Sequence, residues 1–137
     1  MKVINYTDNK RYDIINNLNN DINIVFVYSN SCFHCHELMP VWNKVKNYYK
    51  KSNIQRNILE LEAGDLFKLD YNEINKIVKG YPSMIIINKG KFIKEYNGDR
   101  SFLDIIKFIN FKLHKKNKQK TKNKIKKNKN KTIKKKY

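Results

Sequence analysis

The chain has 137 residues, of which 30 are Lys or Arg and 12 are Asp or Glu, giving a formal net charge of +18 and a pI near 9.9. This length allows one ordinary domain with a core of its own and is too short for two, while two cysteines exclude a disulfide scaffold. No apolar run approaches the roughly 20 residues that cross a bilayer, and the first residues lack the apolar stretch of a signal peptide. We therefore expect no membrane span and a cytoplasmic protein; because Asn, Lys and Ile are so abundant, the virion of an AT-rich DNA virus is the alternative location.

The positive charge is concentrated at the C-terminal end of the chain. Residues 112–137 contain 14 lysines and no acidic residue, which leaves only +4 for residues 1–111. A segment with so few apolar side chains cannot bury enough surface to offset the entropy of ordering. We therefore expect a folded domain over residues 1–111 and a disordered Lys/Asn-rich tail over 112–137. Such a tail can contact nucleic acid or another polyanion without reading a sequence.

The first half of the folded part predicts a helix followed by a strand. Thr7 or Asp8 can cap the helix, whose apolar positions recur at three-residue steps before Asn19-Asn20-Asp21 ends it. The three apolar positions are Tyr12, Ile15 and Leu18. The stretch Ile22 to Tyr28 is apolar at almost every position, as in a strand buried on both faces, and should lie at the centre of a sheet.

The rest of the folded part alternates between helix and strand patterns, which predicts an α/β fold. Pro40 should kink the next helix, whose buried stripe is expected to contain Leu38, Val41, Trp42, Val45 and Tyr49. The predicted elements are a helix from Phe33 to about Lys51, a strand from Asn57 to Glu62, a short helix around Asn72 to Val78, a hairpin of Met84 to Ile87 with Phe92 to Tyr96, and a last helix capped by Ser101 or Asp99 that runs to Leu113.

A Cys-x-x-Cys motif, Cys32-Phe33-His34-Cys35, falls between the buried strand and the helix that follows it. Backbone N–H groups and the dipole at a helix start stabilise a thiolate on the first cysteine, so Cys32 should be the nucleophile. Cys35, one turn later, can then attack the mixed disulfide and release the substrate. A zinc half-site and an inert pair of cysteines are the alternatives. The chain has no second cysteine pair, so the remaining zinc ligands would be His34, His36 and His114, and neighbouring residues in one helical turn do not surround a metal easily.

The motif and its companions resemble the thioredoxin family, and most closely the catalytic domains of protein disulfide isomerase. The resemblance covers residues 1 to about 111. It is carried by the strand Val25 to Tyr28, by Pro40 five residues after Cys35, by Val78 to Pro82, by the Asn-Lys-Gly hairpin and by Tyr96 to Arg100. It implies a thioredoxin fold, with a central mixed β-sheet flanked by helices, and a thiol-disulfide oxidoreductase that needs no cofactor. Its partners would be protein thiols and disulfides, and we expect a monomer.

The resemblance also implies roles for individual residues around the dithiol. The proline that matches Pro82 is cis in the family, and the backbone at the position of Tyr81 pairs with substrate, so we expect Phe33, Tyr81 and Pro82 to contact it. His34 lies inside the motif, where isomerase domains also have histidine. An imidazole there stabilises the Cys32 thiolate and makes the dithiol a better oxidant.

Three positions depart from the family pattern. Ser31 stands where the family has Trp before the first cysteine, and Phe26 stands where it has a buried acid. Glu60 falls at the position of the lysine that normally partners that acid. A carboxyl buried there without a lysine partner could accept the proton that Cys35 must lose, so Glu60 is a candidate catalytic residue.

These departures also motivate a rival function. A thioredoxin-like binding module with weak redox activity, tethered to nucleic acid or another polyanion by the basic tail, would tolerate the loss of the Trp and of the buried acid. The presence of both cysteines with His34 between them favours the enzyme.

Overall fold

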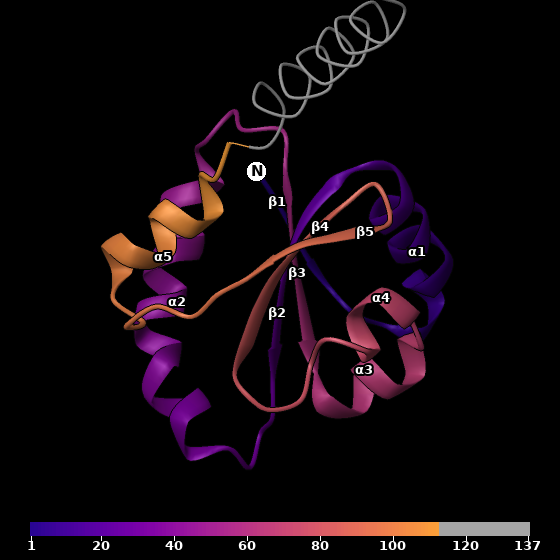
Figure 1. Ribbon diagram of the computed structural model, residues 1–137, viewed down its shortest axis with the longest axis horizontal. Coiled ribbons are helices and arrows are strands. Elements are labelled where there is room, and N and C mark those ends of the chain that lie inside the picture. The colour runs from indigo at the N-terminus through magenta and orange to yellow at the C-terminus, as the bar shows by residue number, and fades with distance from the viewer. Residues whose placement is uncertain (113–137) are drawn as a thin grey trace, which may run out of the picture.

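A five-stranded mixed sheet runs through residues 1–112, the part of the chain that the computed structural model describes (Figure 1). The elements in chain order are β1 Lys2–Asn5, the 3-10 turn η1 Asp8–Lys10, α1 Arg11–Asn20, β2 Ile22–Tyr28, α2 Phe33–Lys50, β3 Asn57–Glu62, α3 Ala63–Leu69, α4 Asn72–Asn75, β4 Ser83–Asn88, β5 Lys91–Glu95 and α5 Phe102–Ile109. Residues 113–137 lie outside the described residues, and with them nearly all of the expected disordered tail and His114.

The strand order is β1-β3-β2-β4-β5, so β2 lies in the middle as its apolar sequence predicts. β1, β3 and β2 run parallel, whereas β4 and β5 are antiparallel to their neighbours. In this register Phe26 lies opposite Glu60 on one side and Met84 on the other. The expected α/β fold with a mixed sheet flanked by helices is confirmed.

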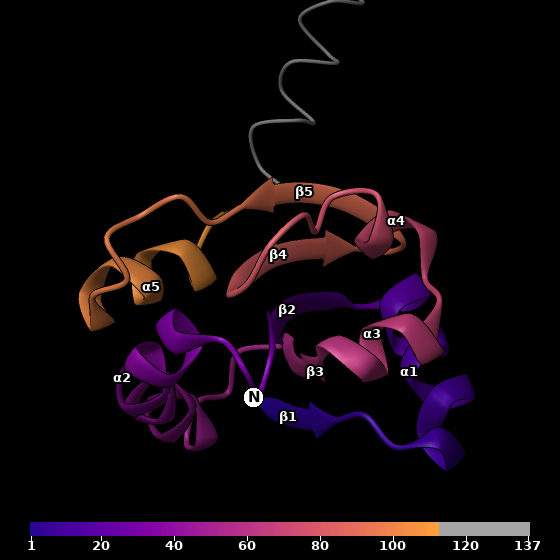
Figure 2. The same ribbon diagram turned by 90° about the horizontal axis from the view of Figure 1, so that it is seen from below.

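Helices cover both faces of the sheet, with α2 and α5 on one side and α1, α3 and α4 on the other (Figure 2). Alternation along β2 divides its side chains between two cores. Val25 and Val27 face the core with α1, α3 and α4, whereas Ile24 and Phe26 face the core with α2 and α5. The second core contains Trp42, Val45 and Tyr49 of α2, all fully buried.

The N-terminal region differs from the sequence-based prediction. Strand β1 was not expected, because four residues at a sheet edge give too short a pattern to recognise. The first helix starts at Arg11 after η1, which shifts its buried positions to Ile14 and Leu18, spaced four apart, and leaves Tyr12 82% exposed. Thr7 makes no side-chain cap and instead donates its hydroxyl to Asn9 Oδ1 at 2.6 Å.

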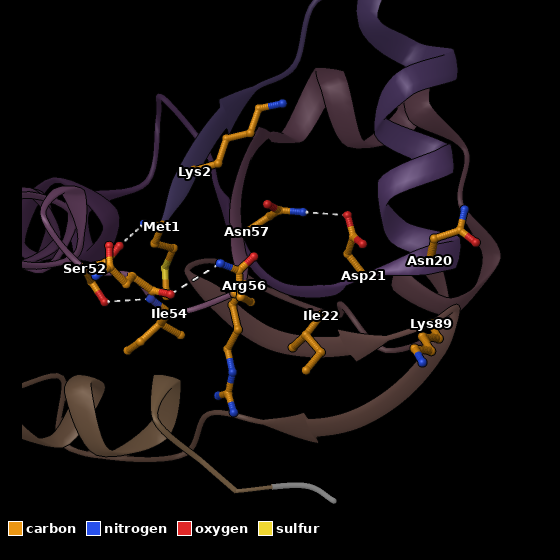
Figure 3. A pocket seen from close by; sticks show the side chains of 12 residues that line it. Met1, Lys2, Asn20, Asp21, Ile22, Ser52, Ile54, Arg56, Asn57 and Lys89 are labelled. Atoms are coloured by element: carbon orange, nitrogen blue, oxygen red, sulfur yellow. Dashed lines mark hydrogen bonds between the residues drawn. The ribbon is translucent and has the colours of Figure 1, made fainter.

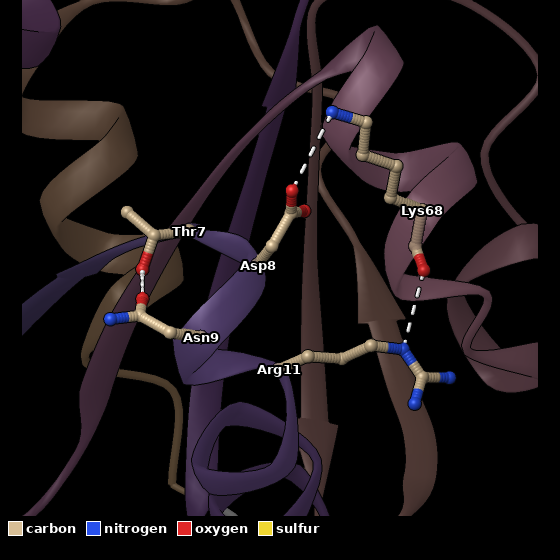
Figure 4. Close-up of polar contacts among 5 residues, drawn as sticks. All are labelled: Thr7, Asp8, Asn9, Arg11 and Lys68. Carbon is tan, nitrogen blue, oxygen red and sulfur yellow. Dashed lines mark hydrogen bonds and ion pairs between the residues drawn. The ribbon is translucent and has the colours of Figure 1, made fainter.

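Polar contacts join η1 and the start of α1 to α3 (Figure 4). Arg11 Nε donates to the carbonyl of Lys68 at 3.3 Å, and Lys68 Nζ lies 4.0 Å from Asp8 Oδ2. Helix α3 was also not expected, although Glu62 caps it by accepting from the N–H of Gly64 and its buried Leu66 and Leu69 are three residues apart. The first residue of α1 is thus bound to the last turn of α3.

The last helix is shorter than predicted. Ser101 caps α5 as expected, since its hydroxyl accepts from the N–H of Asp104 at 3.3 Å. The helix ends at Ile109 instead of Leu113, because the guanidinium of Arg56 donates to the carbonyls of Ile109 and Phe111 and satisfies groups that a longer helix would use. The predicted helix around 72–78 is also reduced, to Asn72–Asn75.

Candidate active site

The dithiol lies where β2 gives way to α2. Cys32 is the N-cap residue of α2, with extended backbone angles, and its Sγ accepts a hydrogen bond from the N–H of Cys35 at 3.2 Å. Cys32 is half-buried, whereas Cys35 is only 1% exposed. This asymmetry lets an incoming disulfide reach Cys32 first, while Cys35 stays within reach of the same sulfur.

The short segment before Cys32 is fixed by local hydrogen bonds. The N–H of Cys32 donates to the carbonyl of Ser29 at 3.1 Å, and the hydroxyls of Ser29 and Ser31 lie 3.1 Å apart. From the other side, Nε2 of His36 lies 2.6 Å from the carbonyl oxygen of Asn30. His36 is exposed and also holds this segment against α2.

The loop that precedes β4 approaches the dithiol. The Tyr81-Pro82 peptide bond is cis, as the family resemblance implies. The thiol of Cys32 donates to the carbonyl of Tyr81 at 3.6 Å. The hydroxyl of Ser83 donates to the carbonyl of Gly80 at 2.7 Å and closes the turn. Residues 32 and 81, far apart in the sequence, therefore meet at one sulfur atom.

Aromatic side chains lie exposed beside this sulfur. Phe33 is 72% exposed and Tyr81 is 40% exposed. The ring of His34, also exposed, meets the ring of Phe33 edge-on with centroids 5.8 Å apart. The residues predicted around the dithiol thus belong to two adjoining segments. One segment contains Cys32, Phe33, His34 and Cys35, and the other contains Tyr81 and Pro82.

Burial raises the pKa of the Cys35 thiol to about 11, and the hydrogen bond with Cys32 adds to this effect. The backbone of Ser29 and the positive charge of Arg100 act in the opposite direction. Arg100 belongs to the Tyr96 to Arg100 motif, but the sequence alone gave it no role. Its positive φ of 65° is held by a hydrogen bond of 2.8 Å from its N–H to the Tyr96 hydroxyl.

Glu60 has a different environment from the one predicted. Its Oε1 accepts from the indole N–H of Trp42 at 3.0 Å and lies 2.7 Å from Lys46 Nζ, both on α2. The expectation of a carboxyl without a lysine partner is therefore wrong: the family's lysine is missing from β3, but α2 supplies another. Moreover, Glu60 is not among the groups that shift the pKa of Cys35.

A separate concavity of about 580 Å³ lies at the other end of the sheet (Figure 3). Lys2 and Arg56 both line it, but their side chains point away from one another, and Arg56 is occupied by the carbonyls of Ile109 and Phe111. None of the predicted site residues lies there. Within residues 1–112, no three His, Cys, Asp or Glu side chains gather as a metal-binding group, and no helix is long and apolar enough to span a membrane.

Comparison with known proteins points to one family, since the model of the thioredoxin family matches residues 2–111. The chain belongs to the thioredoxin family. This thioredoxin domain is 33% identical over 96 residues to human protein disulfide-isomerase TMX3, a match that covers 69% of the chain and 20% of the relative. Thioredoxin domain-containing protein R362 of Acanthamoeba polyphaga mimivirus is 33% identical over 89 residues, covering 64% of the chain and 25% of the relative.

Among solved structures, the J-Trx1 fragment of ERdj5 is similar, with a TM-score of 0.62 at 30% identity, covering 78% of this domain's chain and 49% of that chain. The relatives of this thioredoxin domain are therefore thioredoxin domains of the protein disulfide isomerase type. The chain spans only a fifth to a quarter of the length of the two curated relatives named above.

Proposed function

We propose that this domain is a thiol-disulfide oxidoreductase that exchanges disulfides with protein substrates through Cys32 and Cys35. The observation that carries the proposal is the position of Cys32 as N-cap of α2, half-buried, with the N–H of Cys35 pointing at its sulfur. The alternative nucleophile, Cys35, is buried and its thiol has a raised pKa. The accessible cysteine is thereby the better nucleophile of the two.

The exchange takes place in two steps. The Cys32 thiolate attacks one sulfur of a substrate disulfide, so that a bond from Cys32 to substrate forms, the substrate disulfide breaks, and the departing thiolate takes a proton from water. Cys35 then loses its proton and attacks Cys32, forming the Cys32–Cys35 disulfide and releasing the second substrate thiolate. The substrate disulfide has gained two electrons, and the domain has lost two. With the domain oxidised at the start, the same steps run in reverse.

The second step depends on how Cys35 loses its proton. Its raised pKa opposes that loss at neutral pH, and the positive charge of Arg100 favours it. Glu60 is held by Trp42 and Lys46, so we assign the proton to solvent and not to Glu60. Resolution of the mixed disulfide should then be the slower step near pH 7.

Reduction of insulin by dithiothreitol tests the proposal. The wild-type chain should accelerate precipitation of the insulin B chain, and Cys32→Ser should abolish the acceleration, because no nucleophile remains at the accessible position. Equal rates for wild type, Cys32→Ser and no protein would contradict the enzymatic function and favour the binding module, whose sequence support is the basic tail. The cytoplasmic location stays a prediction.

A further inference from the structure

Two exposed aromatic side chains lie beside the Cys32 sulfur. Phe33 follows Cys32 directly, at the first position of α2, and 72% of its surface is exposed. Tyr81, whose carbonyl lies 3.6 Å from the same sulfur, is 40% exposed. Single exposed aromatic residues are common on protein surfaces, but these two lie on the two segments that meet at one reactive sulfur. The nucleophile therefore has an exposed aromatic residue on each of the two segments that flank it.

These two segments carry no charged side chain. Residues 28–33 and residues 80–83 consist of aromatic, small and amide-bearing or hydroxyl-bearing residues, together with Cys32 and Pro82. A charged substrate residue that lies against these two segments would find no ionic partner on them; the charge of Arg100, which acts on Cys35, comes from the loop before α5. An apolar residue would instead cover the Phe33 ring and remove its surface from water.

We propose that Phe33, together with Tyr81, selects substrates whose reactive cysteine has an aromatic or large aliphatic neighbour in an extended peptide. The inference rests on the proposed function, because the mixed disulfide with Cys32 is what holds the neighbouring substrate residue against Phe33. The covalent bond fixes the substrate backbone within a few ångströms of residue 33. The residues beside the substrate cysteine are then the ones that lie against these rings.

The size of the preference for an apolar over a polar neighbour follows from the apolar area that the substrate side chain can cover. Covering roughly 60 Å² of apolar surface on contact changes a binding or rate constant by about tenfold. Phe33 is exposed over a larger area than this, since an aromatic side chain of this size presents on the order of 150 Å² or more. A preference of about tenfold for apolar over polar neighbours is therefore expected.

Two symmetric peptide disulfides test the inference. Both are hexapeptide dimers joined through one cysteine, which has phenylalanine on each side in one peptide and serine on each side in the other. The rate at which each dimer oxidises the reduced full chain is measured by acid quench and mass spectrometry. The ratio of the two rates cancels any change in the intrinsic reactivity of Cys32 that a substitution beside it causes.

The variants are Phe33→Ser, Phe33→Leu and Phe67→Ser. Phe67 is 85% exposed and belongs to α3, on the opposite face of the sheet from α2, so Phe67→Ser removes a comparably exposed phenylalanine outside the two segments and serves as the matched control. The wild-type ratio should be about tenfold in favour of the apolar peptide, fall several-fold in Phe33→Ser, where only Tyr81 still favours the apolar peptide, and persist in Phe33→Leu and Phe67→Ser.

Equal rates with the two peptides in the wild type would overturn the substrate preference while leaving the oxidoreductase function intact. A preference that persists unchanged in Phe33→Ser would also overturn the role of Phe33. Failure of the wild type to react with either dimer would overturn both the preference and the proposed function.

Discussion

The two cysteines differ most in their exposure to water. Cys32 is reachable, whereas Cys35 lies 1% exposed beneath it, and that burial is the largest cause of its raised pKa. A thiol with a pKa of about 11 is almost entirely protonated at neutral pH, and only the thiolate resolves a mixed disulfide. We therefore expect the attack of Cys32 on a substrate disulfide to be fast and the resolution of the mixed disulfide by Cys35 to be slower.

We predict that the rate of mixed-disulfide resolution rises about tenfold per pH unit between pH 6 and pH 9, because the thiolate fraction of Cys35 grows by that factor below its pKa. The measurement is a single-turnover quench with a peptide disulfide at a series of pH values. Arg100→Gln removes the charge that lowers this pKa and should slow resolution at every pH in this range. Profiles that coincide in the wild type and Arg100→Gln would contradict the role of Arg100.

His34 should make the dithiol more oxidising than that of a thioredoxin. Typical potentials are about −270 mV for thioredoxin and about −180 mV for protein disulfide isomerase. An exposed imidazole between the two cysteines stabilises the reduced form, so His34→Pro should move the potential towards the thioredoxin value. Equilibration with glutathione measures it, with His36→Gln as the control, because His36 lies outside the Cys-x-x-Cys pair. An unchanged potential in His34→Pro would refute the assignment.

At the scale of elements, the longest and most apolar segments are the ones that their own sequence predicts. Helix α2 has enough apolar positions to show its period, strand β2 is recognised by its nearly continuous apolar run, and Asn57–Glu62 is found as β3 with the predicted bounds. Strand β1 and helix α3 are too short to show a period of their own, and their form depends on the sheet that they join.

Some residues of the candidate site can also be predicted from the local sequence, whereas others cannot. The roles of Cys32 and Cys35 follow from a motif at the start of a helix, which is local information. Arg100 and the partner of Glu60 come from other elements, so the sequence around Cys35 or around Glu60 does not reveal them. Lys46 in particular lies on α2, where its spacing gives no sign that it reaches β3.

The contact of Lys46 and Trp42 with Glu60 joins α2 to β3. The Glu60 side chain is 10% exposed and that of Lys46 is 23% exposed, so loss of the ammonium leaves a carboxylate with little water around it. We predict that Lys46→Met lowers the free energy of unfolding by about 1 to 3 kcal/mol. Urea denaturation measures this loss, and the double variant Lys46→Met with Glu60→Gln should recover most of it.

The matched control for this pair is Lys76→Met. Its partner Glu73 forms an ion pair of 2.5 Å, but these two side chains are 60% and 30% exposed. Solvent screens such a pair, so its loss should change stability less. Equal losses for Lys46→Met and Lys76→Met would show that the Glu60 contact does not tie α2 to β3.

At the scale of the whole molecule, the dithiol and the start of the basic segment lie at opposite ends of the sheet. Cys32 follows the end of β2, whereas Arg56, just before the start of the parallel strand β3, contacts the carbonyls of Ile109 and Phe111 (Figure 1). The lysines after Phe111 are therefore attached far from the dithiol. Because its point of attachment is remote from the dithiol, we expect the basic segment to be dispensable for disulfide exchange at Cys32.

We predict that deletion of residues 115–137 abolishes binding to duplex DNA and leaves exchange with a small disulfide unchanged. Binding by the full chain should weaken with salt at a log-log slope of about −0.9 per phosphate neutralised, since lysines alone give no base readout. Fluorescence anisotropy across a salt series measures this slope. Loss of both DNA binding and disulfide exchange on deletion would contradict the separation of the two ends.

The most direct test of the two-cysteine account is a trap for the mixed disulfide. In Cys35→Ser the first step can still take place but the second cannot, so oxidised substrate should accumulate on the protein through a bond to Cys32, detected as an added mass that dithiothreitol removes. Cys32→Ser leaves only the buried Cys35 and should trap about a tenth as much or less, given the dependence of exchange on exposure and thiolate content. Equal trapping by the two variants, or a bond located at Cys35, would contradict the assignment of Cys32 as the nucleophile.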